Sequence, residues 1–199
     1  MAVSSVASLD VASTIRPCLG ESVSGDAVIV KPIEDGLFVA IVDVLGHGPE
    51  AAELAGEIEI YLTQYACRDV SALMKRLHQR LKGSRGAAVG LSFIETEGSY
   101  IEYTGVGNTV IRRFGETETR LVSQDGVLGQ NMRTPRPQRL DLENGDLIVL
   151  YTDGVSDRFS SKDYPGVFLH AADMVAKNIV QRFGKGHDDA ACIAVRYSA

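Results

Sequence analysis

The order of the predicted elements indicates an α+β fold, a sandwich of antiparallel β-sheets with α-helices covering the outer faces. β-rich runs come first, followed by two helical stretches, many short strands, one further helix and a last strand. Short turns between neighbouring strands are typical of hairpins and antiparallel sheets, and an apolar sheet face must be covered by another layer. A doubly wound parallel fold is disfavoured, because it would alternate strand and helix throughout. We expect residues 1–199 to form a single domain, with residues 1–20 as an N-terminal extension or first strand.

The first half of the chain predicts a hairpin and two helices. Residues 28–30 and 37–42 are β-rich and flank the turn-forming sequence Glu34-Asp35-Gly36. A helix is predicted over 49–66, because it begins with proline and its apolar residues recur at helical spacing. Asp69 is the predicted N-cap of the second helix.

The second half predicts mostly strands, at 87–94, 100–104, 110–114, 147–151 and 191–197. An amphipathic helix is predicted over 171–183. The sequence Gly105-Val106-Gly107-Asn108 is interpreted as a tight turn rather than a phosphate loop, because no helix follows it. Residues 124–139, with three arginines among prolines, are interpreted as a solvated loop, and contact with an acidic partner is the alternative.

Composition and charge exclude several classes of protein. The formal net charge of −6 disfavours binding to nucleic acid or to an acidic membrane by bulk attraction. Hydrophobic residues make up 45% of the chain, which argues against disorder, and no apolar run approaches the ~20 residues of a membrane span. Three scattered cysteines and the lack of a secretory signal predict a cytoplasmic protein.

Acidic residues stand at the ends of several predicted strands, beside glycine or another turn former: Asp26, Asp43, Asp153, Asp188 and Asp189. Each alone could be a turn or cap residue. Together they suggest convergence, because a sheet brings strand ends from distant parts of the chain to one rim. Converging carboxylates repel unless cations lie between them, and oxygen-only ligands favour Mg²⁺ or Mn²⁺. A pair of such ions is a recurring device for hydrolysing phosphate esters.

Two histidines lie close to these acids in sequence. His47 stands between the glycines that follow Asp43, and His187 precedes Asp188. Because the rest of the constellation offers oxygen ligands, we expect His47 to cap a helix or contact the ligands rather than bind metal, and we interpret His187 in the same way.

Five motifs in order resemble those of the metal-dependent type 2C serine/threonine protein phosphatases, in particular the bacterial branch typified by SpoIIE and RsbU. These motifs are Ser24-Gly25-Asp26, Asp43-Val44-Leu45-Gly46-His47-Gly48, Gly105-Val106-Gly107-Asn108, Tyr151-Thr152-Asp153-Gly154-Val155 and Gly186-His187-Asp188-Asp189-Ala190. The resemblance runs from about Gly25 to the C-terminus. It implies two β-sheets packed face to face with helices outside, and two Mn²⁺ or Mg²⁺ ions.

The resemblance also implies a role for each matching residue. Asp43 would bridge both ions, the backbone carbonyl of Val44 would help to hold one of them, and Asp153 and Asp188 would hold the other. Asp26 would lie close by and bind a water ligand of the ions. Asp189 would position these ligands, and we expect Gly154 and His47 to lie around them.

The sequence departs from the family pattern at two positions. Val44 replaces the usual glycine after the bridging aspartate, and Leu45 stands where eukaryotic members have a histidine, as expected for the bacterial branch. The short chain is most similar to stand-alone stressosome phosphatases of the RsbX type. The implied substrates are phosphoserine or phosphothreonine on the stressosome scaffold protein and its partner, in resetting a bacterial stress response.

Two other functions remain open from the sequence. One is a catalytically degenerate, phosphatase-like binding module, which the departures at Val44 and Leu45 keep in consideration. Retention of several strand-end carboxylates argues against it, because without metal they would only repel one another. The other is a phosphatase that acts on a small-molecule phosphomonoester.

Overall fold

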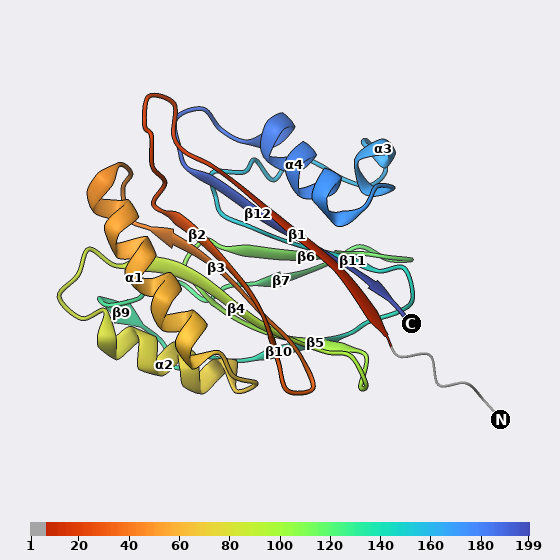
Figure 1. Cartoon of the computed structure of the whole chain (residues 1–199), viewed down its shortest axis with the longest axis horizontal. Helices are drawn as coiled ribbons and strands as arrows, with labels where there is room; N and C mark the ends of the chain where they lie inside the picture. The colour runs from red at the N-terminus through yellow and green to blue at the C-terminus, as the bar shows by residue number, and fades with distance from the viewer. Residues whose placement is uncertain (1–6) are drawn as a thin grey trace.

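Two five-stranded antiparallel sheets pack face to face in the computed structural model, which describes residues 7–199 (Figure 1). One sheet has the strand order β1-β12-β11-β6-β7 and the other has the order β10-β5-β4-β3-β2. A small third sheet consists of two short strands, β8 (Gly126–Val127) and β9 (Asn131–Met132). The predicted fold class is therefore confirmed.

The sheet that begins with β2 is built from five strands: β2 (Asp26–Ile33), β3 (Gly36–Val44), β4 (Ala87–Glu95), β5 (Tyr100–Val106) and β10 (Gln138–Asp141). Helices α1 (Pro49–Tyr65) and α2 (Val70–Arg80) cover its outer face (Figure 1). Pro49 begins α1 as predicted, and the Asp69 side chain accepts a hydrogen bond of 2.8 Å from the Ala72 amide at the start of α2.

The other sheet also has five strands: β1 (Ser8–Arg16), β6 (Val110–Phe114), β7 (Thr119–Val122), β11 (Leu147–Tyr151) and β12 (Ala190–Ser198). Its outer face is packed against α4 (Ala172–Phe183) and the short α3 (Pro165–Phe168). The long strands β1 and β12 pair in antiparallel register from Ser8 opposite Ser198 to Arg16 opposite Ala190.

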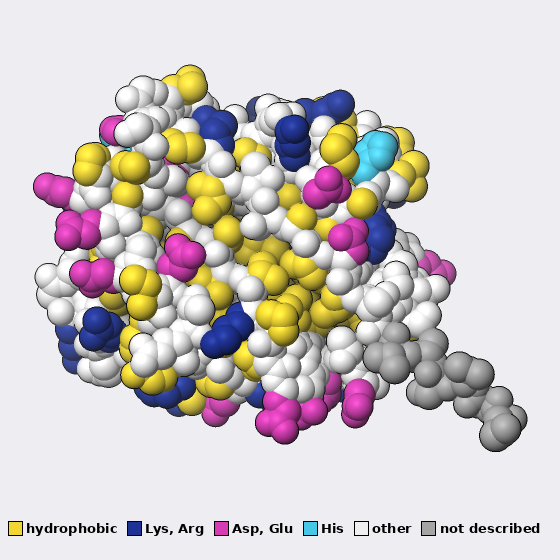
Figure 2. All heavy atoms as spheres, viewed as in Figure 1, with side chains coloured by type: hydrophobic (Ala, Val, Ile, Leu, Met, Phe, Trp, Pro, Cys, Tyr) yellow, Lys and Arg dark blue, Asp and Glu magenta, His cyan; other side chains and the backbone are white. Residues whose placement is uncertain are grey.

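Three hydrophobic clusters follow from the two-residue period of the strands. Along β3, Val42 and Val44 point toward α1 and α2, whereas Val39 and Ile41 point into the space between the sheets. A separate cluster lies beneath α4. A band of hydrophobic side chains also crosses the middle of one face of the molecule, between α1 and α2 on one side and α3 and α4 on the other (Figure 2). The parity of β3 places Asp43 on the inter-sheet face.

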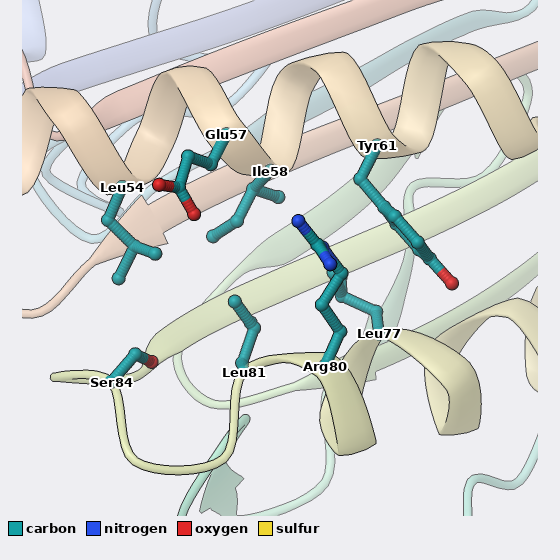
Figure 3. Close-up of a pocket in the computed structure, with 8 residues that line it drawn as sticks. All are labelled: Leu54, Glu57, Ile58, Tyr61, Leu77, Arg80, Leu81 and Ser84. Atoms are coloured by element: carbon teal, nitrogen blue, oxygen red, sulfur yellow. The ribbon is translucent and has the colours of Figure 1, made fainter.

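The helix pair α1–α2 leaves a hollow of about 160 Å³ on the outer side of the sheet (Figure 3). Its lining comes from both helices and the segment after α2: Leu54, Glu57, Ile58, Tyr61, Leu77, Arg80, Leu81 and Ser84. Because α1 and α2 cover the face opposite to the inter-sheet core, this hollow is separate from the strand-end aspartates.

Several elements differ from the sequence prediction. Of the predicted N-terminal segment, residues 8–16 form β1 at the edge of a sheet, and residues 1–6 lie outside the described part of the chain. The segment 124–139 is not simply a loop, because it contains β8 and β9 and the start of β10. Strand β7 and helix α3 were not predicted, since each is short and lacks a clear apolar period. None of the helices formed by residues 7–199 is long and apolar enough to cross a membrane.

Candidate metal centre

Asp26 and Asp43 come from neighbouring strands and lie opposite one another in the β2–β3 ladder. Asp26 is the first residue of β2, and Asp43 is the next-to-last residue of β3. Directly opposed residues of an antiparallel pair project from the same face of the sheet. The hairpin register therefore places two carboxyl groups side by side at one end of the inter-sheet space.

The other sheet brings Asp153, Asp188 and Asp189 to the same end. Asp153 follows the last residue of β11 by two positions, and Asp188 and Asp189 directly precede β12. Strands β11 and β12 are antiparallel neighbours, so the end of one lies beside the start of the other. The charges of Asp153, Asp188 and Asp189 all act on Asp43, which places the acids of both sheets at one site.

Thr152 joins the two sheets at this site. Its hydroxyl donates a hydrogen bond of 2.8 Å to Oδ2 of Asp26 and accepts one of 3.0 Å from the Ala191 amide. Thr152 is fully buried, so the hydroxyl has no water to replace these partners. Sequence reasoning gave Thr152 no role, although its place directly before Asp153 at the end of a buried strand was the available signal.

The carboxylate of Asp189 ties backbone segments together. Oδ1 accepts a hydrogen bond of 2.8 Å from the Cys18 amide, and Oδ2 accepts one of 2.8 Å from the Gly25 amide. Asp189 is 4% exposed, and these two amides satisfy both of its oxygens. Because Gly25 directly precedes Asp26, Asp189 fixes the start of β2 against the start of β12.

Gly154 allows the loop after β11 to approach β12 closely. A β-carbon at Gly154 would overlap the carbonyl oxygen of Asp189. The Gly154 carbonyl also accepts a hydrogen bond of 2.7 Å from the Lys185 amide. The small size of glycine therefore sets the separation between Asp153 and the Asp188–Asp189 pair.

The aspartates at this site repel one another and are partly shielded from water. Burial and the neighbouring charges of Asp153 and Asp188 raise the pKa of Asp43 to about 8. Burial and the charge of Asp43 raise the pKa of Asp26 well above its usual value, against the opposing effect of the Thr152 hydrogen bond. Burial and Asp153 raise the pKa of Asp188, while the Asp189 amide and Lys185 act in the opposite direction.

The donor set at this site suits hard divalent cations. The converging groups are carboxylates, and none of these five aspartates forms an ion pair with Lys or Arg within residues 7–199. Mg²⁺ and Mn²⁺ favour such oxygen ligands and would offset the repulsion. In the part of the chain that the structure describes, no three His, Cys, Asp or Glu side chains have the spacing of a preformed metal site.

The other predicted residues occupy the surroundings of this site. Val44 ends β3 with its side chain buried beneath the helices, an extended position that suits a β-branched residue. His47 does not cap α1, because the N-cap is Gly48; the His47 Nδ1 lies 2.9 Å from Oε1 of Glu21. His187 is exposed.

Arg85 supports the loop after β3, a contact that sequence reasoning missed. Its guanidinium donates a hydrogen bond of 3.1 Å to the Leu45 carbonyl and pairs at 2.5 Å with Glu50 in the first turn of α1. The Leu45 amide in turn donates to the Gly86 carbonyl at 3.1 Å. Arg85 and Gly86 thus fix the loop that carries Val44 and Leu45.

The raised pKa values predict an unusual pH dependence for the chain in chelator. A carboxyl group whose pKa is higher in the folded state contributes stability that is complete below the unfolded pKa and is lost as pH rises through the folded pKa. For Asp43 that loss extends from about pH 4 to about pH 8, and Asp26 and Asp188 act in the same direction. We expect the melting temperature in EDTA to fall between pH 5.5 and pH 8.5, and excess Mn²⁺ to restore it at the higher pH. A profile that is flat in EDTA, with no effect of Mn²⁺, would contradict this account of the site.

Replacing Thr152 with valine tests the link between the sheets. The isosteric change removes the hydroxyl and leaves the Ala191 amide and Asp26 without a buried partner. We expect a loss of about 1–3 kcal/mol in the free energy of unfolding, measured by urea denaturation in EDTA. Thr152→Ser keeps the hydroxyl and is the matched control. Equal stability of the valine and serine variants would show that the two hydrogen bonds contribute little.

A family model described as Stage II sporulation protein E (SpoIIE) matches residues 33–198. The range includes Asp43, Asp153, Asp188 and Asp189, and it begins after Asp26.

Three solved structures share the fold over nearly the whole chain. One of them is a chain from a study of the bacterial stressosome, which that study describes as a modular system adapted to control secondary messenger signalling. It is 26% identical to this chain, with a TM-score of 0.87, and the match covers 95% of this chain and 100% of that one. RsbX in complex with magnesium is 21% identical, with a TM-score of 0.82 and 96% of each chain covered. The catalytic domain of the serine/threonine phosphatase PstP, in complex with two manganese ions, is 16% identical, with a TM-score of 0.71 and coverage of 97% and 100%.

Proposed function

The chain belongs to the SpoIIE family, within the bacterial SpoIIE- and RsbU-like branch of the type 2C phosphatases, and we therefore propose that it is a metal-dependent protein serine/threonine phosphatase. The proposed reaction is hydrolysis of phosphoserine or phosphothreonine to the free hydroxyl and inorganic phosphate. The observation that supports it most strongly is the meeting of Asp26 and Asp43 from one sheet with Asp153 and Asp188 from the other.

In this proposal, Asp43, Asp153 and Asp188 would hold two Mn²⁺ or Mg²⁺ ions. The Val44 carbonyl and Asp26 would lie beside these three ligands. The presence of magnesium in RsbX and of two manganese ions in PstP supports this choice of ions. Such ions, when bound, supply an activated water for attack on phosphorus and offset negative charge on the phosphoryl oxygens.

The chain's own residues would orient this chemistry. Thr152 holds the Asp26 carboxylate at the start of β2 through a hydrogen bond of 2.8 Å to Oδ2. Asp189 fixes the amides of Cys18 and Gly25, and through them the start of β2. Gly154 lets Asp153 approach Asp188. A rigid frame matters, because misplacement of catalytic groups by about 1 Å can reduce a rate by about a hundredfold.

The substrates we propose are phosphorylated stressosome proteins, namely the scaffold protein and its partner, with action in the cytoplasm to reset a stress response. Two likenesses support this proposal, one to a chain from a study of the bacterial stressosome and one to RsbX, each over at least 95% of both chains. A phosphorylated stressosome protein is the direct test of this substrate class.

That test is incubation of the protein with phosphorylated stressosome scaffold protein and Mn²⁺, with and without EDTA. We expect phosphate release that EDTA abolishes and renewed Mn²⁺ restores. Activity on p-nitrophenyl phosphate but not on the phosphoprotein would favour a small-molecule phosphatase. Binding of the scaffold without turnover of either substrate would favour a binding module.

A further inference from the structure

Arg133 and Arg136 lie three positions apart in the chain. Both are exposed and lie between β9 and β10. Six other arginines form ion pairs: Arg68, Arg85, Arg112, Arg113, Arg120 and Arg139. Within residues 7–199, neither Arg133 nor Arg136 has an ion-pair partner. On a chain of net charge −6, they place two cations in one short segment, and the nearby Asp125 forms no ion pair with either of them.

The segment that carries these two arginines is held in place. Pro135, between them, is buried, and proline fixes its own backbone angle φ. The Arg136 amide donates a hydrogen bond of 2.8 Å to Oε1 of Gln124, and Nε2 of Gln138 donates one of 2.8 Å to the Val122 carbonyl. The two guanidinium groups are therefore carried on a backbone that is anchored on both sides.

The two arginines line the same hollow, of about 500 Å³. The other lining residues are Gln124, Met132 and Thr134. A second hollow of about 240 Å³ adjoins it, shares Met132 and Arg133, and is also lined by Asp125. The larger hollow combines two cations with neutral polar groups and a flexible apolar side chain, which suits a short polypeptide segment bearing carboxylates.

This basic hollow lies at the metal-site end of the β10-β5-β4-β3-β2 sheet. Val44 pairs with Ala87 in the β3–β4 ladder, and Ala87 forms a bridge to Leu128 between β8 and β9. On the other side, Gln124 exchanges backbone hydrogen bonds of 2.9 and 2.8 Å with Gly105 and Gly107 at the end of β5. The segment with Arg133 and Arg136 is thus attached to the same end of the sheet as Asp43.

We propose that this hollow binds an acidic segment next to the phosphorylated residue of the protein substrate. The inference rests on the proposed phosphatase function and adds a substrate class to it: phosphoserine or phosphothreonine with Asp or Glu nearby in the sequence. Arginine suits this role because its planar guanidinium can donate two hydrogen bonds to one carboxylate. Binding of the acidic segment beside the reaction site raises the local concentration of the substrate's phosphoryl group there. The hollow itself then needs no catalytic group.

Charge reversal with a matched control tests the proposal. The variant Arg133→Glu/Arg136→Glu is compared with Lys75→Glu/Lys177→Glu, which replaces two exposed lysines on α2 and α4 and changes the net charge by the same amount. The probes are two fluorescent phosphoserine peptides, one with flanking Asp and Glu and one with Asn and Gln in their place. Fluorescence anisotropy in EDTA reports binding without turnover.

We expect wild type and the lysine control to bind the acidic peptide at least about fivefold more tightly than the neutral one, and salt to weaken that preference. The arginine variant is expected to lose the preference. The docking proposal would be overturned if both double variants lost the preference for the acidic peptide equally, or if wild type showed no such preference. Absence of Mn²⁺-dependent hydrolysis with the binding preference intact would instead count against the phosphatase function, so the two failures are distinguishable.

Discussion

Replacing Asp43 with asparagine is expected to leave the protein folded and to reduce Mn²⁺-dependent phosphate release by about a hundredfold or more. Asparagine has nearly the same shape but removes the carboxylate on which Asp153, Asp188 and Asp189 all act. Loss of several kcal/mol of metal-derived stabilisation of the transition state accounts for a rate effect of this size. The measurement is initial rates on phosphoprotein and on p-nitrophenyl phosphate at saturating Mn²⁺.

The same substitution has a stability signature that a folding defect would not give. Removal of one charge from the repelling cluster is expected to maintain or raise the melting temperature in EDTA at pH 8. The additional stabilisation by Mn²⁺ seen for wild type should be lost, because an ion stabilises only the state that binds it. Asp141→Asn, at an exposed carboxylate on β10, is the control. Full activity of the Asp43 variant would remove the metal assignment.

The second large effect is expected for Gly154→Ala. The new methyl group would overlap the Asp189 carbonyl oxygen, which is fixed backbone rather than a flexible side chain. The loop that carries Asp153 must then move away from Asp188 and Asp189, and the hydrogen bond from the Lys185 amide to the Gly154 carbonyl is strained. We expect a loss of about 3 kcal/mol or more in the free energy of unfolding, together with weakened Mn²⁺ binding.

Gly56→Ala is the matched control for this substitution. Gly56 lies within α1, and a β-carbon there would meet no neighbouring atom within 4 Å. Alanine is the better helix former, so this variant should gain about 0.5–1 kcal/mol and keep its activity. Urea denaturation in EDTA compares the two variants directly. If Gly154→Ala is as stable as wild type and binds Mn²⁺ normally, the close approach of the two loops is not required.

Much of the fold could be predicted because its elements carry local signals. The proline that begins α1, the aspartate that caps α2 and the turn between β2 and β3 each act within a few residues. The strand-end aspartates were recognisable for the same reason, since each follows or precedes a β-rich run. Their convergence was predicted because strand ends meet at the rim of a sheet, and the family resemblance added the role of each residue. The contact of the acids of one sheet with those of the other depends on the inter-sheet packing.

The remaining features depend on contacts between distant parts of the chain. Strand β1 has a mixed pattern of exposure and exists because nine of its residues pair with β12. The turn at Gly105–Asn108 looks like a hairpin turn, but it carries the chain from one sheet to the other. Thr152 and Asp189 act through partners 126 and 164 residues away, Asp26 and Gly25 respectively. No pattern within a short window identifies such partners.

Calorimetric titration of the metal-free protein with Mn²⁺ tests the central claim most directly. If the aspartates from the two sheets hold the catalytic ions, wild type should bind about two ions per chain with release of protons, because carboxyl groups with raised pKa values must ionise. The Asp43→Asn variant should lose most of this binding while remaining folded. Absence of Mn²⁺ binding by the folded wild-type chain, or unchanged stoichiometry and affinity in the variant, would contradict the assignment.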